Sequence, residues 1–168
     1  FDGLAAIKHG NGKYWWVIFK DWNPLSLLTY NNRFHVYLVN ENGPILFQTQ
    51  NIGVMNNDGG GQLLFNESGS LLYLCTWAGA LEYLSFDRCT GQLSNPIIVE
   101  QPHSTQPYPY YASLALSPDE TKLYVTGIGQ ASSLGGTDSL YQFDLNASNI
   151  LASKTHIYGM PNVKIGIG

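Results

Sequence analysis

The sequence predicts an all-β protein, and three observations support this prediction. Only 12% of the 168 residues are charged, about half of the usual share of about 25%. Eighteen residues are glycine, and most of the polar residues are Asn, Gln, Ser and Thr, which favour turns and strand edges over helices. Three segments of the chain also repeat the same order of turn and strand signals, and no window shows helical periodicity.

The repeat is clearest when Gly12, Gly69 and Glu120 are aligned, which gives intervals of 57 (69 − 12) and 51 (120 − 69) residues. An aromatic and an aliphatic residue then follow each turn, as Trp16-Val17, Tyr73-Leu74 and Tyr124-Val125. A short apolar stretch precedes each turn, and an alternating stretch follows it. Each of the three segments is therefore predicted to form a β-hairpin.

Two further extended stretches complete each unit. The third strands are expected at 34–39, 81–87 and 140–145, and the fourth at 45–50, 97–100 and 150–157. Four antiparallel strands in a repeat of this length make one blade of a β-propeller. We therefore predict three blades, at about 3–53, 57–102 and 110–159, with 160–168 starting a further blade.

Three blades are fewer than the four to eight that usually close a propeller ring. We therefore expect this chain either to be part of a longer chain or to form a half-ring that a second subunit completes. Trp15 and Trp16 are neighbours on one strand, so they must face opposite sides of their sheet. Tyr73 and Tyr124 are expected to pack between blades, where replacing either by Ala should cost on the order of 3 kcal/mol.

Several motifs resemble known bacterial propellers. Residues 114–126 contain Ser-Pro-Asp-Glu followed by Leu-Tyr-Val, which is similar to the blade motif of YVTN-like propellers, including lactonase-like ones. Segments 8–16, 86–96 and 140–145, in that order, resemble the WD-type propeller region of gliding-motility-associated surface proteins exported by the type IX system. This resemblance implies a secreted or cell-surface location, and it implies no catalytic residues.

The two cysteines, Cys75 and Cys89, are too few for a disulfide framework. If 72–77 and 81–87 form a hairpin about Ala78-Gly79, Cys75 faces the neighbourhood of Tyr83 and not Cys89. We expect two free thiols, with a bridge between them as the less favoured alternative.

A ligand-binding face is predicted where the loops between second and third strands meet the loops between blades. These loops are expected at 20–32, 53–61, 101–111 and 127–137. They are aromatic, polar and nearly uncharged, which suits a polysaccharide or an extended peptide of a protein partner. The alternative is a structural role, in which the aromatic rings cover blade edges. The candidate ligand-binding residues are Trp22, Tyr30, His103, Tyr108, Tyr110 and Tyr111.

Other kinds of site find less support. The net charge of −4 and the absence of a Lys/Arg cluster argue against nucleic acid, and no apolar run is long enough to embed the chain in a membrane. The four histidines lack metal-ligand spacing, so we expect no metal and no cofactor. Asp87 and Asp144 end third strands and are expected to cap turns. Asp138-Ser139-Leu140 resembles an O-glycosylation sequon of the same bacterial group, which makes Ser139 a candidate for modification.

The function we expect from the sequence is a non-enzymatic binding or scaffold module of a secreted surface protein. The alternative is a lactonase-like hydrolytic propeller enzyme, which the 118–125 motif favours. The inner strands offer Ala5, Gln62 and Ser113 at aligned positions, and none of these is a good general base. The third hypothesis is a purely structural spacer.

Overall fold

The strands of the chain follow one another as successive antiparallel hairpins in a computed structural model, which describes residues 3–21, 31–56, 60–103, 110–128 and 137–161. Within these residues the strands are β1 (Leu4–Lys8), β2 (Trp15–Lys20), β3 (Asn31–Asn40), β4 (Gly43–Asn56), β5 (Gly61–Phe65), β6 (Leu71–Thr76), β7 (Leu81–Asp87), β8 (Gln92–Glu100), β9 (Tyr110–Leu116), β10 (Lys122–Ile128), β11 (Thr137–Asp144) and β12 (Thr155–Pro161). One 3₁₀ turn, η1 (Leu151–Ser153), precedes β12.

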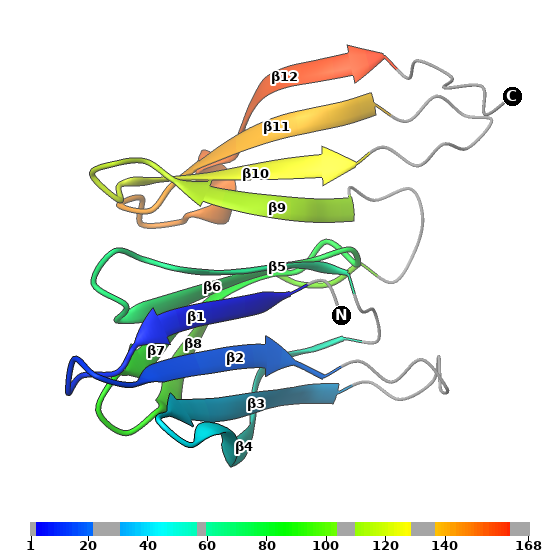
Figure 1. Cartoon of the computed structure of the whole chain (residues 1–168). Helices are drawn as coiled ribbons and strands as arrows, with labels where there is room; N and C mark the ends of the chain where they lie inside the picture. Colours follow the sequence, from blue (N-terminus) through cyan, green and yellow to red (C-terminus); the bar gives the residue numbers. More distant parts are fainter. Residues whose placement is uncertain (1–2, 22–30, 57–59, 104–109, 129–136, 162–168) are drawn as a thin grey trace, which may run out of the picture.

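The strands form three four-stranded antiparallel sheets, which we call blade 1 (β1–β4), blade 2 (β5–β8) and blade 3 (β9–β12). In each blade the strands pair in sequence order, as they do in a propeller blade (Figure 1). The predicted all-β fold built from propeller blades is therefore confirmed. The three sheets do not close into a ring.

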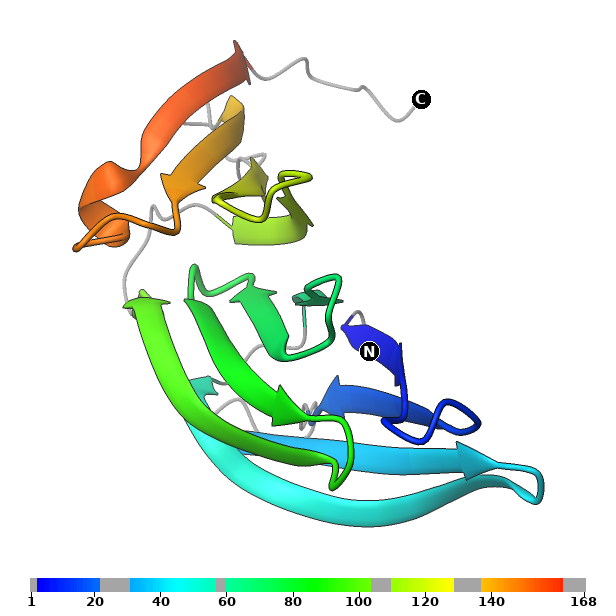
Figure 2. The same ribbon diagram turned by 90° about the vertical axis from the view of Figure 1, so that its left-hand side faces the viewer.

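The blades fan out around a shared edge made by their first strands (Figure 2). β5 contacts both β1 and β9, while β4 and β8 contact each other farther out. β2 and β10 end at the same end of the molecule at which β3 and β11 begin, and the connections between blades leave from that end too (Figure 1). We call it the loop end, and the opposite end, where the β1–β2 and β9–β10 turns lie, the turn end.

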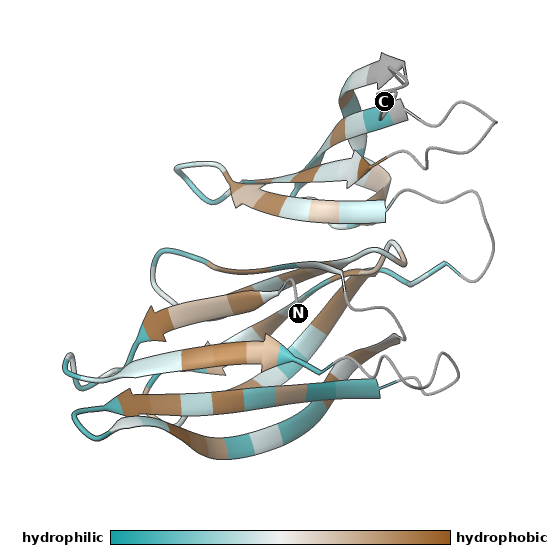
Figure 3. Cartoon of the chain, turned by 45° about the vertical axis from the view of Figure 1, so that its right-hand side comes forward, coloured by the Kyte–Doolittle hydropathy of each residue, from teal (hydrophilic) through white to brown (hydrophobic). Residues whose placement is uncertain are grey.

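Two apolar clusters fill the two seams between blades. Trp16 and Ile18 of blade 1 pack with Leu72, Leu74 and Leu84 of blade 2. The opposite face of blade 2 packs on blade 3 through a second cluster, which contains Tyr73, Cys75, Leu81, Leu123, Val125 and Phe143. Apolar and polar bands alternate along the strands, because successive side chains point to opposite faces of a sheet (Figure 3).

The predicted alignment of turns agrees with the backbone. Gly12, Gly69 and Glu120 all have positive φ, at 73°, 71° and 55°. Trp16 and Tyr73 are both buried against the following blade, whereas Trp15 faces away from blade 2 and is exposed. The prediction that Trp15 and Trp16 lie on opposite faces is confirmed. Tyr124 differs from Tyr73, because no blade follows blade 3 among the described residues.

Several predicted boundaries need correction. β4 runs beyond 53 to Asn56, and Met160 and Pro161 belong to β12 and not to a further blade. The stretch 150–157 was expected to be a strand throughout, but η1 occupies its first half. Asn149 Oδ1 accepts a hydrogen bond from the Ala152 amide, and Ser153 Oγ donates to the Ile150 carbonyl. These local bonds compete with strand pairing, so β12 begins only at Thr155.

Cys75 and Cys89 are thiols and do not form a disulfide. Cys75 is buried and pairs across the hairpin with Leu81, while Cys89 is exposed at the turn end. The hairpin turns where it was predicted, because the Gly79 amide donates to the Thr76 carbonyl. Asp87 and Asp144 also act as expected, since each carboxylate accepts a backbone amide of the turn that follows it.

Candidate functional site

Four polar side chains meet in the seam between blades 2 and 3. Glu100 ends β8 at the loop end, and its Oε1 lies 3.0 Å from His103 Nε2. Its other oxygen, Oε2, accepts a hydrogen bond of 2.7 Å from the hydroxyl of Tyr111, which is the second residue of β9. Lys154 Nζ reaches Glu100 Oε2 at 3.2 Å and also contacts the Tyr111 hydroxyl. We call these four residues the Glu100 cluster.

Tyr111 and Lys154 make further contacts that support the Glu100 cluster. Tyr111 is buried, and burial together with the negative charge of Glu100 raises the pKa of its phenol far above the usual value. Tyr111 is therefore neutral, and its hydroxyl donates a hydrogen bond to the Glu100 carboxylate. Lys154 Nζ lies 4.7 Å from the centre of the Tyr141 ring, which adds a cation–π contact to its ion pair.

His103 is the most accessible member of the cluster. Its side chain is 39% exposed, whereas that of Glu100 is 10% exposed. Its backbone amide donates to the Ala78 carbonyl in the β6–β7 turn, which fixes the residue against blade 2. A carboxylate that contacts one imidazole nitrogen holds the ring in one orientation. This arrangement can accept a proton from a molecule at the loop end.

A second buried carboxylate lies in the seam between blades 1 and 2. Glu82, on β7, is fully buried and lies 3.5 Å from Lys20 Nζ at the end of β2. Glu82 Oε2 accepts the Val54 amide, and Lys20 Nζ donates to the Val54 carbonyl, both at 2.8 Å. A Cβ atom at Gly53 would lie 2.3 Å from Glu82 Oε2, so only glycine leaves room for the carboxylate. These groups satisfy one another, which indicates a structural role.

The residues predicted to form the ligand face have different positions. His103 lies at the loop end, half-exposed, as expected. Tyr110 and Tyr111 are not loop residues, because both belong to β9, and Tyr111 is buried in the seam with its hydroxyl on Glu100. Trp22, Tyr30 and Tyr108 lie outside the described residues. Ligand binding by this set stays a prediction.

Ser139 lies within β11, where it pairs with Gly159 of β12 and is only 8% exposed. A glycan on its hydroxyl would need space around a side chain that is buried in this structure. O-glycosylation at Ser139 stays a prediction, to be checked by the mass of the peptide that contains it.

The inner strands offer no general base at the three aligned positions, as expected. Ala5 is buried, the side-chain oxygen of Gln62 accepts the Leu114 amide, and Ser113 shares a hydrogen bond of 2.6 Å with Thr126. Across the described ranges, no three His, Cys, Asp or Glu side chains come close enough together to hold a metal ion. The same ranges contain no helix long and apolar enough to cross a membrane.

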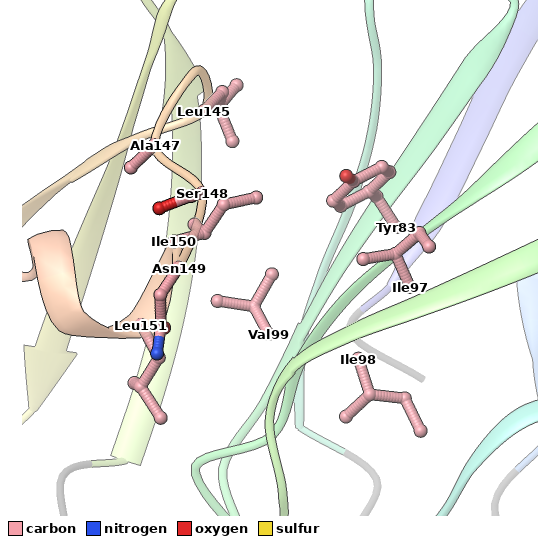
Figure 4. Close-up of a pocket in the computed structure, with 10 residues that line it drawn as sticks. All are labelled: Tyr83, Ile97, Ile98, Val99, Leu145, Ala147, Ser148, Asn149, Ile150 and Leu151. Atoms are coloured by element: carbon pink, nitrogen blue, oxygen red, sulfur yellow. The ribbon is translucent and has the colours of Figure 1, made fainter.

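A groove of about 420 Å³ opens between blade 2 and blade 3. Figure 4 shows Tyr83 and three residues of β8 on one side, and residues of the β11–β12 connection on the other. Most of its lining is aliphatic, and Tyr83 is its one titratable side chain. The groove therefore offers a surface for contact but no group for acid–base chemistry.

Sequence reasoning missed the pairing of both buried carboxylates. Glu82 stands between Leu81 and Tyr83 in an apolar strand, and Lys20 follows five apolar residues. These two apolar contexts were the sequence signal for the pair. A charged residue inside such a strand needs a buried partner. The partner of Glu100 could not be found in this way, because Lys154 stands between the polar residues Ser153 and Thr155 and has no apolar strand around it.

The solved structures that resemble the chain include two proteins named as enzymes. One is named "putative 6-phosphogluconolactonase", from Bacteroides uniformis; the match has 20% identity and a TM-score of 0.55, and covers 94% of this chain and 40% of that one. The other is named a luciferin-regenerating enzyme, with 10% identity and a TM-score of 0.52, and the match covers 91% of this chain and 45% of that one. The chain thus spans less than half of the length of either protein.

No family model matches the chain, and no curated protein does. The expected resemblance to WD-type and YVTN-like propellers of secreted surface proteins is therefore supported only as far as the propeller-like fold. The expectation of a non-enzymatic binding or scaffold module is contradicted, because both neighbours carry the names of enzymes. They agree better with the alternative, a lactonase-like propeller. At these identities the likeness establishes the fold alone: the chain is a three-bladed segment of propeller-like architecture.

Proposed function

We propose that this chain forms part of a lactonase-like hydrolytic propeller enzyme, and that the reaction takes place at the loop end. The observation that carries the proposal is the match of 94% of the chain to a structure named as a lactonase. The Glu100 cluster supports it, because His103 and Glu100 form an acid–base pair at that end, and the side chain of His103 is 39% exposed.

Lactone hydrolysis needs a base at one step and an acid at the next. A water oxygen adds to the carbonyl carbon while its proton passes to the base. The ring C–O bond then breaks, and the leaving oxygen takes up a proton to give the hydroxy acid. In our proposal His103 accepts and returns this proton, and Glu100 stabilises the imidazolium between the two steps. Tyr111 and Lys154 are positioning residues that hold Glu100 in place.

The charges at the loop end favour a neutral lactone over a phosphorylated one. A phosphate group needs cations that are available to bind it. Lys154 and Lys20 lie in the two seams, and each is already engaged by a buried carboxylate. Arg33, near the start of β3, is paired with Asp21 at 3.5 Å. The chain also has an overall net charge of −4. We therefore expect glucono-δ-lactone to be hydrolysed faster than its 6-phosphate.

The experiment measures hydrolysis of both lactones in a pH-stat, with the unsubstituted chain, His103→Gln and the control His9→Gln. His9 lies at the turn end, where it stacks on Trp16 at 5.0 Å. We expect His103→Gln to lower kcat by about 100-fold or more, and His9→Gln to leave it nearly unchanged. The proposal fails if neither lactone is hydrolysed, or if both variants keep full activity.

The location of the protein is a separate proposal, supported by the motifs at 8–16, 86–96 and 140–145. We propose a secreted or cell-surface protein, with export by the type IX system as the finer expectation. Fractionation of the source cells, with protease treatment of intact cells, tests the location. Recovery of the protein only from the cytosolic fraction would contradict it.

A further inference from the structure

The two end blades present faces that fit the pattern of the two seams between them. In each seam the earlier blade contributes a buried aromatic side chain from its second strand, Trp16 in one and Tyr73 in the other. The later blade contributes aliphatic side chains that flank the equivalent position. They are Leu72 and Leu74 in the first seam, and Leu123 and Val125 in the second.

Blade 3 carries the aromatic half of this pattern on its outer face. Tyr124 is aligned with Trp16 and Tyr73, and it shares the outer face with Gln142 and Thr155, its neighbours along the ladder. Tyr158, which pairs with Leu140 on the same face, is 55% exposed. We call this surface, defined by Tyr124, Leu140 and Tyr158, the leading face.

Blade 1 carries, on its outer face, the positions that receive the aromatic side chain in each seam. Trp15 and Val17 are aligned with the residue pairs that receive the aromatic side chain in the seams. They share the outer face of blade 1 with Leu4, Phe19 and Tyr37, and Trp15 is 46% exposed. Phe19 stacks on Tyr37 at 5.7 Å, so the surface is preformed. We call this surface, defined by Leu4, Trp15, Val17, Phe19 and Tyr37, the receiving face.

We propose that the receiving face of one copy packs against the leading face of a second copy, so that two copies close a six-bladed ring. One chain holds one face of each kind, so two chains are complementary at both junctions, and a two-fold axis closes the assembly. Six blades lie within the usual range for a propeller.

Exposed apolar sheet faces of this kind occur where another surface covers them. The repeat specifies what that surface is: a blade that offers an aromatic residue at the position of Trp16 and Tyr73. The second copy supplies it as Tyr124. Ring closure also completes the loop end, which one chain supplies only in part. The inference rests on the pattern of the seams and not on the proposed lactonase activity.

The test is the native mass of the 168-residue chain by light scattering over a dilution series, with three variants. Trp15→Glu places a charge on the receiving face, and Tyr158→Glu places one on the leading face. Ile97→Glu is the matched control, because Ile97 is 46% exposed, as Trp15 is, but lines the groove between blades 2 and 3 and lies on neither proposed face. Far-UV circular dichroism checks that each variant keeps its strands.

We expect the unsubstituted chain and Ile97→Glu to have the mass of two copies, and Trp15→Glu and Tyr158→Glu each to have the mass of one. Mixing the last two variants should restore part of the dimer, because a mixed dimer keeps one junction without a substitution. The proposal is overturned if the unsubstituted chain stays a single copy at high concentration. The leading and receiving faces would then be covered by further blades of a longer chain. It is equally overturned if Trp15→Glu alone disrupts the dimer, which would mean that like faces meet, or if the mixture stays monomeric.

Discussion

Glu120 occupies a turn position at which the other two repeats have glycine. Its φ of 55° is in the left-handed region, which costs a non-glycine residue roughly 1–2 kcal/mol. In return its carboxylate crosses to blade 2, where it accepts the Glu67 amide at 2.5 Å and the side-chain amide of Asn66 at 3.1 Å. The strained residue thus fastens the turn of blade 3 to the turn of blade 2.

This balance predicts an order of stability for two substitutions at Glu120. Glu120→Gly loses the two hydrogen bonds but relieves the strain, so its stability should lie within about 1 kcal/mol of the original. Glu120→Ala loses the same bonds and keeps the strain, so it should be less stable than Glu120→Gly by about 1 kcal/mol. Urea unfolding of the two variants checks the order. If Ala proved as stable as Gly, the backbone strain would not be real.

The ion pair between Lys20 and Glu82 predicts a large effect of losing one partner. Lys20→Met leaves a fully buried carboxylate without its cation, which should cost about 3–5 kcal/mol. The matched control is Arg33→Met, which breaks a partly exposed pair with Asp21 and should cost less than about 1 kcal/mol. Urea unfolding measures both. Equal, small losses would show that Glu82 is not buried in solution.

Tyr73 predicts a loss of stability in alkali. Its burial raises the pKa of its phenol from 10.0 to about 12. Above pH 10 the unfolded chain therefore releases this proton while the folded chain keeps it, so stability is complete below pH 10 and falls as the pH rises toward 12. Tyr73→Phe should flatten this fall, as measured by the urea midpoint between pH 8 and pH 11. A Phe variant with an unchanged pH slope would contradict the burial of the hydroxyl.

Among the elements, the second strands of the blades offer a direct test of the repeat. Tyr73 packs between blades 2 and 3, so Tyr73→Ala should cost about 3–5 kcal/mol. Tyr124 occupies the aligned position on the outer face of blade 3. Tyr124→Ala in dilute, single-copy protein should therefore cost only about 1 kcal/mol. Thermal unfolding of the two variants at low concentration checks the difference, and equal losses would mean that Tyr124 is covered within one chain.

The strands were largely predictable because their signals are local. Turn residues near Gly12, Gly69 and Glu120 and the alternation that follows them lie within a few residues of one another, and β7 was predicted with its observed bounds. The start of β12 was not predicted. There, Asn149 and Ser153 bond the backbone of the 3₁₀ turn, and apolar residues at 150 and 151 resemble a strand in sequence.

At the scale of the molecule, the blades were predictable but the site was only partly so. A period of about 50 residues specifies blades, because each blade must bury both faces. The Glu100 cluster joins residues from two blades, and no spacing in the sequence brings Lys154 to Glu100. His103 was predicted as a site residue because the 101–111 stretch is rich in aromatic residues. Its contact with Glu100 was not predicted, because it depends on where β8 ends.

The function of the molecule is the point at which sequence reasoning failed. The absence of a catalytic motif on the inner strands favoured a non-enzymatic module, and that inference ignored the seams. In the function we propose, the site is assembled from several blades, of which this chain supplies three. The structural neighbours corrected the expectation because they share the architecture and carry enzyme names.

The most direct test of the account is the specific lactonase activity of the unsubstituted chain across a dilution series, with the native mass measured in the same samples. The account predicts hydrolysis of a neutral lactone, with an activity per chain that falls as the two-copy ring dissociates. The ring completes the loop end, so single copies should have little activity. A closed ring with no lactonase activity, or an activity per chain that is the same in single copies, would contradict it.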